Sequence, residues 1–386
     1  MSILLDSLFF SLLGFEIFGT EIEEKLKDTY TPEALSGLYK LSKKHDLTHL
    51  VADALDKNGL FKDGGELSKR FLQERDLAVY RYKRLEHELG QISRVLEHAG
   101  IPFMPLKGSV LRNYYPAPWM RTSCDIDVLV REETLASAIR VLTEELKYSE
   151  GARGSHDVAM VAPSGVHIEL HFRLTAEEGS VCDILEGVFE GLEDGWSYRY
   201  AMTPEMFYFY HIAHMAIHMR TGGCGVKPFL DLKIMRDRMA LDRERVDSLL
   251  IRGNLLAFEK ESVDLANCWF ANAPFSDVSV TFGEYILYGG VYGNMQNHVA
   301  VEQIKRGGKA AYILSRVFVG FDELSIKYPS LKRRKLLFPL YQVYRWFDLL
   351  LNKASRDHVR ATVKKTAETD EASISTTEKL FDALGL

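Results

Sequence analysis

Apolar residues recur every three to four positions through the first quarter of the chain, which is the spacing of one face of an α-helix. One long run covers residues 67–99 and stops at Gly100, a residue type that commonly ends helices. Thr31-Pro32-Glu33 combines a capping side chain, a proline suited to the first turn and an acid near the positive end of the helix dipole. These signals predict an N-terminal helical region over residues 1–98.

From residue 99 to about 200 the pattern becomes that of short strands alternating with short helices. Pro163-Ser164-Gly165 separates two apolar runs and has the composition of a hairpin turn. The order β-α-β-α-β-β predicts an α/β or α+β core in this part of the chain. The predicted strands are 101–106, 125–130, 156–162 and 166–174, and the predicted helices are 109–115 and 134–146.

Helical spacing returns after residue 200. Thr203-Pro204-Glu205 is another capped start, and further helical segments are predicted over 227–239, 243–272 and 332–353. Residues 364–377 are rich in Thr, Ser, Ala and charge, which is typical of a flexible tail before a last helix. The expected division is a helical region 1–98, a core 99–200, a helical domain 201–355 and a partly flexible tail 356–386.

Composition fits a globular protein of two or three domains, with 386 residues, 46% hydrophobic and 26% charged. A net charge of -6 argues against a protein that coats nucleic acid through its whole surface, while a local basic patch stays open. Residues 1–19 are apolar but contain Asp6 and Glu16, so neither a secretory signal nor a transmembrane span is predicted.

The cysteines give no sign of a zinc knuckle or a redox pair, because no two of them form a CxxC motif. Scattered cysteines fit a reduced setting, so a cytoplasmic location is expected. They are Cys124, Cys182, Cys224 and Cys268.

Two acids lie one residue apart in the predicted strand 125–130. Alternate side chains of a strand share a face, so Asp125 and Asp127 point together while Ile126 points into the core. Their Cα atoms are expected roughly 6.6 Å apart, which lets both carboxylates share metal ions separated by ~3.5–4 Å. Magnesium prefers such hard oxygen ligands and keeps substrate phosphates in its shell.

A third acid, Glu169, lies in the predicted strand 166–174, on one face with His167, His171 and Arg173. An acid on such a polar face can complete a metal site or act as a general base. Taken singly, each of these acids could instead belong to a solvated strand face. The ordered set is more specific than its parts.

Lys107-Gly108-Ser109 lies where a strand is expected to end and a helix to begin. A glycine there lets backbone N–H groups approach phosphate oxygens, and Ser109 can donate to a phosphate. Lys107 or Arg121 could offset developing negative charge, although a solvated lysine is the plainer alternative. The expected nucleotide-binding residues are therefore Lys107, Gly108, Ser109, Arg121 and His171.

This ordered pattern resembles the DNA polymerase β-type nucleotidyltransferase superfamily, in which Gly-Ser on a turn precedes Asp-x-Asp and then a single acid. The longer string LKGSVLRNYYPAPWMRTSCDIDVLV, followed by VHIELHFRL, resembles one branch, an uncharacterised bacterial nucleotidyltransferase family. The specific matches cover residues 105–174. The flanking helices, with His214, His218 and Asp231, resemble that family more loosely. Residues 114–120 lengthen the gap between Ser109 and Asp125 relative to compact members.

The resemblance implies an α+β fold, with a small mixed β-sheet core flanked by N- and C-terminal helical regions. It also implies that Asp125, Asp127 and Glu169 bind magnesium, as two ions, and that Gly108 and Ser109 hold the triphosphate. The predicted reaction moves a nucleoside monophosphate from a nucleoside triphosphate, ATP among the candidates, to a hydroxyl. That hydroxyl could belong to RNA, protein, a sugar or a small molecule.

Two other functions stay open. A metal-dependent sugar-nucleotide glycosyltransferase also uses Asp-x-Asp, but it needs a long Rossmann-like region ahead of the acids, where this chain is predicted to be helical. A non-catalytic nucleotide-binding protein could keep the fold without turnover, although retention of all three acids argues against it.

The segment 327–365 is basic, with eleven Lys or Arg against Asp348 and Asp357. Aromatic residues are interleaved with this charge. A phosphate-bearing partner such as RNA, or an anionic lipid surface, would suit the segment. The favoured interpretation is an amphipathic helix that packs its aromatic residues on the domain. The aromatic residues are Phe338, Tyr341, Tyr344, Trp346 and Phe347.

Overall fold

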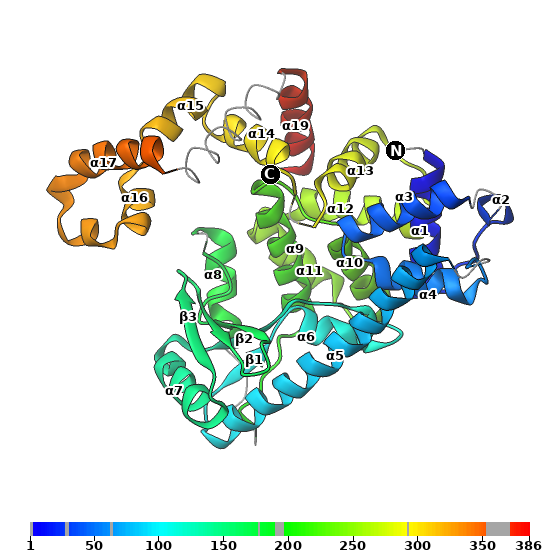
Figure 1. Ribbon diagram of the computed structural model, residues 1–386, viewed down its shortest axis with the longest axis horizontal. Helices are drawn as coiled ribbons and strands as arrows, with labels where there is room; N and C mark the ends of the chain where they lie inside the picture. Colours follow the sequence, from blue (N-terminus) through cyan, green and yellow to red (C-terminus); the bar gives the residue numbers. More distant parts are fainter. Residues whose placement is uncertain are drawn as a thin grey trace. The chain divides into compact units, whose positions relative to one another are not determined.

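The structure, a computed structural model, forms two compact units (Figure 1). Unit 1 comprises Met1–Ala216 and Val226–Val280, and unit 2 comprises Ile217–Gly225 and Thr281–Leu386. The four-part division expected from the sequence stays a prediction. The described residues are 3–27, 31–61, 65–176, 178–189, 197–291, 293–352 and 371–386.

Helices fill the N-terminal part of unit 1, as predicted. Thr31 caps α3 by accepting a 3.2 Å hydrogen bond from the Ala34 backbone, and Gly100 follows α5 with a positive φ of 66°. The first helix packs inward, with Leu8, Phe9, Leu12 and Leu13 buried. These helices are α1 Ile3–Phe18, α2 Glu24–Lys27, α3 Pro32–Lys44, α4 Thr48–Lys57 and α5 Glu66–His98.

A buried acid in α1 makes stability depend on pH. Glu16 accepts a 2.6 Å bond from Lys57 through Oε1, while its buried Oε2 has no partner among the described residues. Burial, together with nearby Asp53, raises the pKa of Glu16 to about 7, although Lys57 opposes the shift. The protonated form therefore stabilises the native state at low pH, and this stabilisation is lost as pH rises from about 4.5 through 7.

We expect Glu16→Gln to increase the free energy of unfolding at pH 8 by about 1–2 kcal/mol, and by much less at pH 5. Urea unfolding of both proteins at the two pH values measures the difference. Glu21→Gln, at an exposed position outside the helices, is the control and should change neither value. An equal effect of Glu16→Gln at both pH values would contradict this assignment.

The described strands form one mixed sheet in the order β1-β2-β5-β4-β3. Strands β2 and β5 are parallel and central, and the other neighbours are antiparallel. The sheet and its flanking helices confirm the predicted α+β fold. The strands are β1 Phe103–Pro105, β2 Asp125–Val130, β3 Ser149–Arg153, β4 Asp157–Val161 and β5 His167–His171.

One face of the sheet is packed against helices and the other is left for polar side chains. Helix α5 and helix α7 (Leu135–Leu146) contribute to a single apolar cluster on the packed face. Because side chains alternate along a strand, the intervening residues of β2 and β5 point to the opposite face. The cluster residues from β2 and β5 are Ile126, Val128, Val130, Ile168 and Leu170.

The sequence prediction missed β3, the edge strand. All five of its residues, Ser149–Arg153, are exposed, so the apolar alternation that marks a half-buried strand is absent. Two charged side chains, Glu150 and Arg153, stand on this open edge, which discourages pairing with another chain.

Helices α9 and α10 agree with the prediction, whereas α8 and α13 were not predicted and one predicted helix is broken in two. The segment predicted as one helix over 243–272 is two, because the chain turns at Gly253 and at Asn254, whose φ is 53°. The remaining elements are α6 Gly108–Leu111, α8 Ser180–Glu186, α9 Pro204–Arg220, α10 Lys227–Arg238, α11 Arg243–Arg252, α12 Leu256–Phe270 and α13 Asp277–Gly289; α9 and α13 run on into unit 2.

Unit 2 is helical in its described part. Helix α19 confirms the predicted last helix and buries Leu380, Phe381 and Leu384. Residues 353–370, which include the first half of the predicted flexible segment 364–377, lie outside the described residues; residues 371–377 belong to α19. Among the helices that are described, none is long and apolar enough to cross a membrane. The helices are α14 Met295–Lys305, α15 Lys309–Val317, α16 Phe321–Lys327, α17 Phe338–Leu351 and α19 Glu371–Leu384.

Candidate active site

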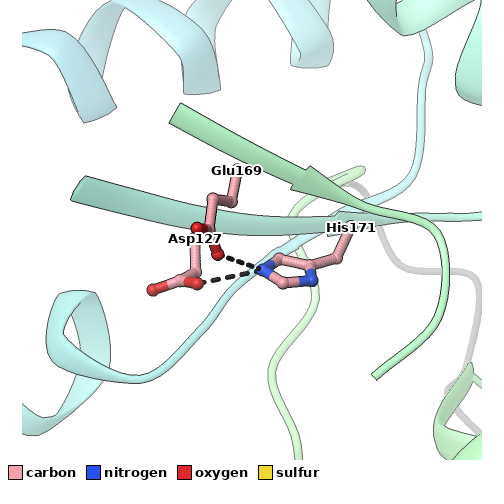
Figure 2. Close-up of side chains that lie close together, drawn as sticks. All are labelled: Asp127, Glu169 and His171. Atoms are coloured by element: carbon pink, nitrogen blue, oxygen red, sulfur yellow. Dashed lines mark hydrogen bonds and ion pairs between the residues drawn. The ribbon is translucent and has the colours of Figure 1, made fainter. Parts of the chain in front are cut away.

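The central parallel strands bring two of the predicted acids face to face. In the register of β2 and β5, Asp127 is paired with Glu169, and both point away from the packed face (Figure 2). Asp125 lies two residues earlier on the same face of β2, opposite His167. The Asp-x-Asp spacing thus works as predicted, since the intervening Ile126 is fully buried in the core.

His171 joins Asp127 and Glu169 in a compact cluster. Its Nε2 lies 2.9 Å from Asp127 Oδ1 and 3.3 Å from Glu169 Oε2 (Figure 2). One ligand atom from each of the three residues falls within 4.8 Å of the others, so the group could hold a metal ion. Asp125 is not part of that group. The sequence prediction placed His171 at the nucleotide and missed its place among the acids.

Lys107 reaches into this cluster from the end of β1. Its Nζ donates to Asp127 Oδ1 at 2.7 Å and lies 4.0 Å from Glu169. Its backbone has φ 44° and ψ -120°, a left-handed region that is rare for a residue with a side chain. Such strain persists only where the surroundings enforce it, and it is common at functional sites.

The surrounding charges shift the pKa values of Asp125 and Asp127 in opposite directions. Burial opposes ionisation of Asp127, but bonds from His171 and Lys107 outweigh burial and hold its pKa well below the usual value. Burial and the charges of Asp127 and Glu169 raise the pKa of Asp125 to about 6. Asp127 is therefore a permanent anion, and Asp125 can gain or lose a proton near neutral pH.

The pKa of His171 is raised by the same carboxylates. Burial of the ring opposes protonation, but hydrogen bonds to Asp127 and Glu169 outweigh that effect. Its second ring nitrogen, Nδ1, is buried and has no hydrogen-bond partner among the described residues. Among the described residues, the hydrogen bonds of the imidazole are therefore those to the two acids, and its ring also lies 5.7 Å from that of His156.

Gly108 permits a close approach of the turn to the segment that leads into β2. A Cβ atom at this position would lie 3.2 Å from Ser123 Cβ, so a side chain would push the two segments apart. Ser109 follows in α6, which is only four residues long, and its backbone N–H already bonds Leu106. The group of Ser109 that a ligand could use is therefore its hydroxyl, and not a free backbone N–H at the start of a helix.

A cavity of about 200 Å³ opens beside Ser109. Tyr114, Tyr200 and Phe207 give it an aromatic lining, and Arg199 adds a positive charge. Flat aromatic walls with a few polar groups are typical of pockets for small ligands.

Arg121, which the sequence predicts at the nucleotide, is bound to a buried acid, and its role at the nucleotide stays a prediction. Its Nε donates to both carboxylate oxygens of Asp231 at 2.8 and 2.9 Å, and Asp231 also accepts a 2.7 Å bond from Tyr115. Asp231 is fully buried in α10. Arg121 thus anchors the loop behind Gly108 and does not project among the acids.

Tyr210 is a site residue that the sequence prediction missed. It lies on α9, and its pKa is raised by burial and by the charges of Asp127 and Glu169, while Lys107 opposes the shift. Its phenol is therefore neutral beside the cluster. The run Phe207-Tyr208-Phe209-Tyr210 reads as ordinary core in the sequence, so no local signal marks this position.

The protein has an α+β core with acids on one face of the sheet and Lys107 beside them. Its class of enzyme is the nucleotidyltransferases. Residues 32–271 match the family described as "uncharacterised nucleotidyltransferase", and because this match spans more than half of the chain, the protein belongs to that family. None of the curated proteins matches the chain. The solution structure of the antibiotic-resistance factor ANT(2'')-Ia is similar at 14% identity, covering 45% of this chain and 93% of that one, with a TM-score of 0.32.

Proposed function

We propose that the protein transfers a nucleoside monophosphate from a nucleoside triphosphate to a hydroxyl acceptor in a magnesium-dependent reaction. The observation that carries this proposal is the pairing of Asp127 with Glu169 on adjacent strands, with Asp125 on the same face and Lys107 between the acids and the Gly108 turn. Membership of the polymerase β-type superfamily and a cytoplasmic location stay predictions.

The donor set fits a hard divalent cation. Carboxylate oxygens of Asp125, Asp127 and Glu169 are the proposed ligands, with His171 beside them. The cluster already attracts a cation, since the Lys107 ammonium bonds Asp127. Bound magnesium would neutralise charge on the triphosphate and lower the pKa of the attacking hydroxyl.

In the proposed reaction the acceptor oxygen forms a bond to the α-phosphorus, and the bond from that phosphorus to the bridging oxygen of pyrophosphate breaks. Glu169, which is partly exposed, would accept the hydroxyl proton. Lys107 and Ser109 would hold the leaving pyrophosphate. The aromatic cavity beside Ser109 is the proposed place for the nucleoside.

The two alternatives are less well supported. A glycosyltransferase needs a Rossmann-like region before the acids, and the described residues there form helices α1 to α5. A non-catalytic binder would not need all three acids, Asp125, Asp127 and Glu169, which this chain retains on one face of the sheet.

Isothermal titration calorimetry with ATP, GTP, CTP and UTP, with and without Mg²⁺, tests the proposal. We expect one nucleotide to bind only with Mg²⁺, and the variant Asp125→Ala/Asp127→Ala to lose that binding. Asp76→Ala, at a highly exposed acid of α5, is the control and should bind normally. If no nucleotide binds the folded wild type, the proposed function is wrong.

Lys107→Met gives a second prediction, because the ammonium competes with a metal ion for Asp127. In the absence of nucleotide, Mn²⁺ should bind the variant about ten-fold more tightly, whereas the nucleoside triphosphate should bind about ten-fold more weakly. Electron paramagnetic resonance of free Mn²⁺ measures the first effect and calorimetry the second. Lys83→Met, at an exposed lysine, serves as control. Weaker Mn²⁺ binding would show that Lys107 does not compete with the metal.

A further inference from the structure

Helix α17 in unit 2 leaves an apolar stripe exposed to solvent. Its exposed large hydrophobic residues recur three or four positions apart, which places them on one helical face, and Leu336 continues the stripe in the preceding turn. Their exposed fractions run from 42% to 96%. In a helix that packs on a domain this face is normally the buried one. The residues are Leu336, Leu340, Val343, Tyr344, Phe347 and Leu351.

The opposite face of α17 fixes this orientation. Arg345 donates to the Val317 and Arg316 carbonyls at 3.2 and 2.8 Å, and Trp346 Nε1 donates to Val317 at 2.8 Å. Gln342 is buried and donates to the Val319 carbonyl. The helix therefore uses its polar and indole N–H groups to hold the segment 316–319. The interpretation that it packs its aromatic residues on the domain is wrong for Tyr344 and Phe347, which are exposed.

Helix α15 and the residue after it carry further exposed apolar side chains. Ile313, Leu314, Val317 and Phe318 are each more than two-fifths exposed, and the Phe318 ring lies 5.5 Å from Trp346. Because segment 316–319 is bound by the opposite side of α17, the term apolar face of unit 2 is kept for the stripe of α17 alone. Monomeric proteins seldom leave so many neighbouring apolar side chains in water without a partner.

This apolar face lies in a strongly basic stretch. Residues 305–351 contain ten Lys or Arg against Asp322, Glu323 and Asp348, a net charge of +7 in a chain whose total is -6. The four consecutive basic residues 332–335 lead directly into α17, and all four are exposed. Attraction to an anionic surface is therefore concentrated where apolar side chains can be inserted.

We propose that the apolar face of unit 2 and its basic residues dock on an anionic lipid surface. Aliphatic side chains such as Leu340 and Leu351 gain free energy from entering the acyl boundary, while cations beside them attract lipid headgroups. A nucleic acid would satisfy the charge but would leave the aliphatic residues in water. A second copy would bring like charges of +7 together, which opposes self-association.

Co-sedimentation of the full chain with vesicles tests the proposal. We expect binding to vesicles of phosphatidylcholine and phosphatidylglycerol in a 3:1 ratio, and little binding to phosphatidylcholine alone. Changing Lys332, Arg333, Arg334 and Lys335 to Gln should weaken binding at least about ten-fold. The variant Leu340→Ser/Phe347→Ser/Leu351→Ser should also lose binding, even at low salt. Ile251→Ser, at an exposed apolar residue of α11, is the matched control and should bind as wild type.

Three results would overturn the proposal. The first is equal binding to both kinds of vesicle or to neither. The second is full retention of binding by the triple serine variant with displacement by poly(A), which would indicate a nucleic-acid site. The third is that light scattering shows the wild type to be a dimer and the triple variant a monomer, while the wild type does not bind vesicles. Every substituted position is exposed, so circular dichroism should show each variant folded.

Discussion

Asp127→Asn is expected to lower the rate of nucleotidyl transfer by at least about 10³-fold while the fold is retained. Asp127 is the point at which Lys107 and His171 converge, and it is the most strongly acidic carboxyl of the cluster. Asparagine keeps the shape of the aspartate side chain but removes the negative charge that a bound metal ion and the Lys107 ammonium both require. Steady-state release of pyrophosphate, with the nucleotide identified by calorimetry, measures the effect.

Glu132→Gln is the control for this change. Glu132 lies two residues after the end of β2, is exposed, and pairs only with Arg173 among the described residues. It should keep the wild-type rate within about two-fold. If Asp127→Asn retained more than a tenth of the activity, Asp127 would not be a ligand or charge centre in the reaction.

Asp231→Ala is expected to reduce the free energy of unfolding by about 3–5 kcal/mol. The substitution leaves the Arg121 guanidinium buried without its counter-charge and removes the acceptor of the Tyr115 hydroxyl. Breaking a buried ion pair from one side is far more harmful than removing both partners, because one charge is left unsolvated. Urea unfolding followed by circular dichroism measures the loss.

The same helix supplies a matched control for this prediction. Asp237 of α10 pairs with Lys233 four residues away on the surface, and Asp237→Ala should change stability by less than about 1 kcal/mol. The double variant Arg121→Met/Asp231→Leu should recover much of the stability lost by Asp231→Ala. A loss below about 1 kcal/mol in Asp231→Ala would mean that Arg121 finds solvent or another partner.

Most of the fold follows from local signals. Alternation of apolar and polar residues predicted β2 and β5, and a capping threonine predicted the start of α3, because both depend on neighbouring residues only. Where such signals are weak the prediction was wrong. The exposed strand β3 carries no alternation, and the turn at Asn254 interrupts a run that is apolar on both sides.

Those parts of the candidate site that depend on the geometry of a single strand could be predicted from the sequence. That Asp125 and Asp127 share a face follows from the two-residue period of a strand. The pairing of Asp127 with Glu169 depends on the register of two strands that are 42 residues apart, and no local pattern specifies that register. The partner of Arg121 lies 110 residues further along the chain, which explains why its role could not be predicted.

The ion pair between Arg121 and Asp231 sets an order of events during synthesis. When the last strand of the sheet has been made, at His171, the ribosome must add about 60 residues before Asp231 exists. At rates of about 5–20 residues per second this takes roughly 3–12 s. During that interval Arg121 lacks its carboxylate partner Asp231 behind the glycine turn. The Gly108 turn, proposed above to hold phosphate, is therefore anchored only when α10 has joined the core, and truncated products that end earlier should be inactive.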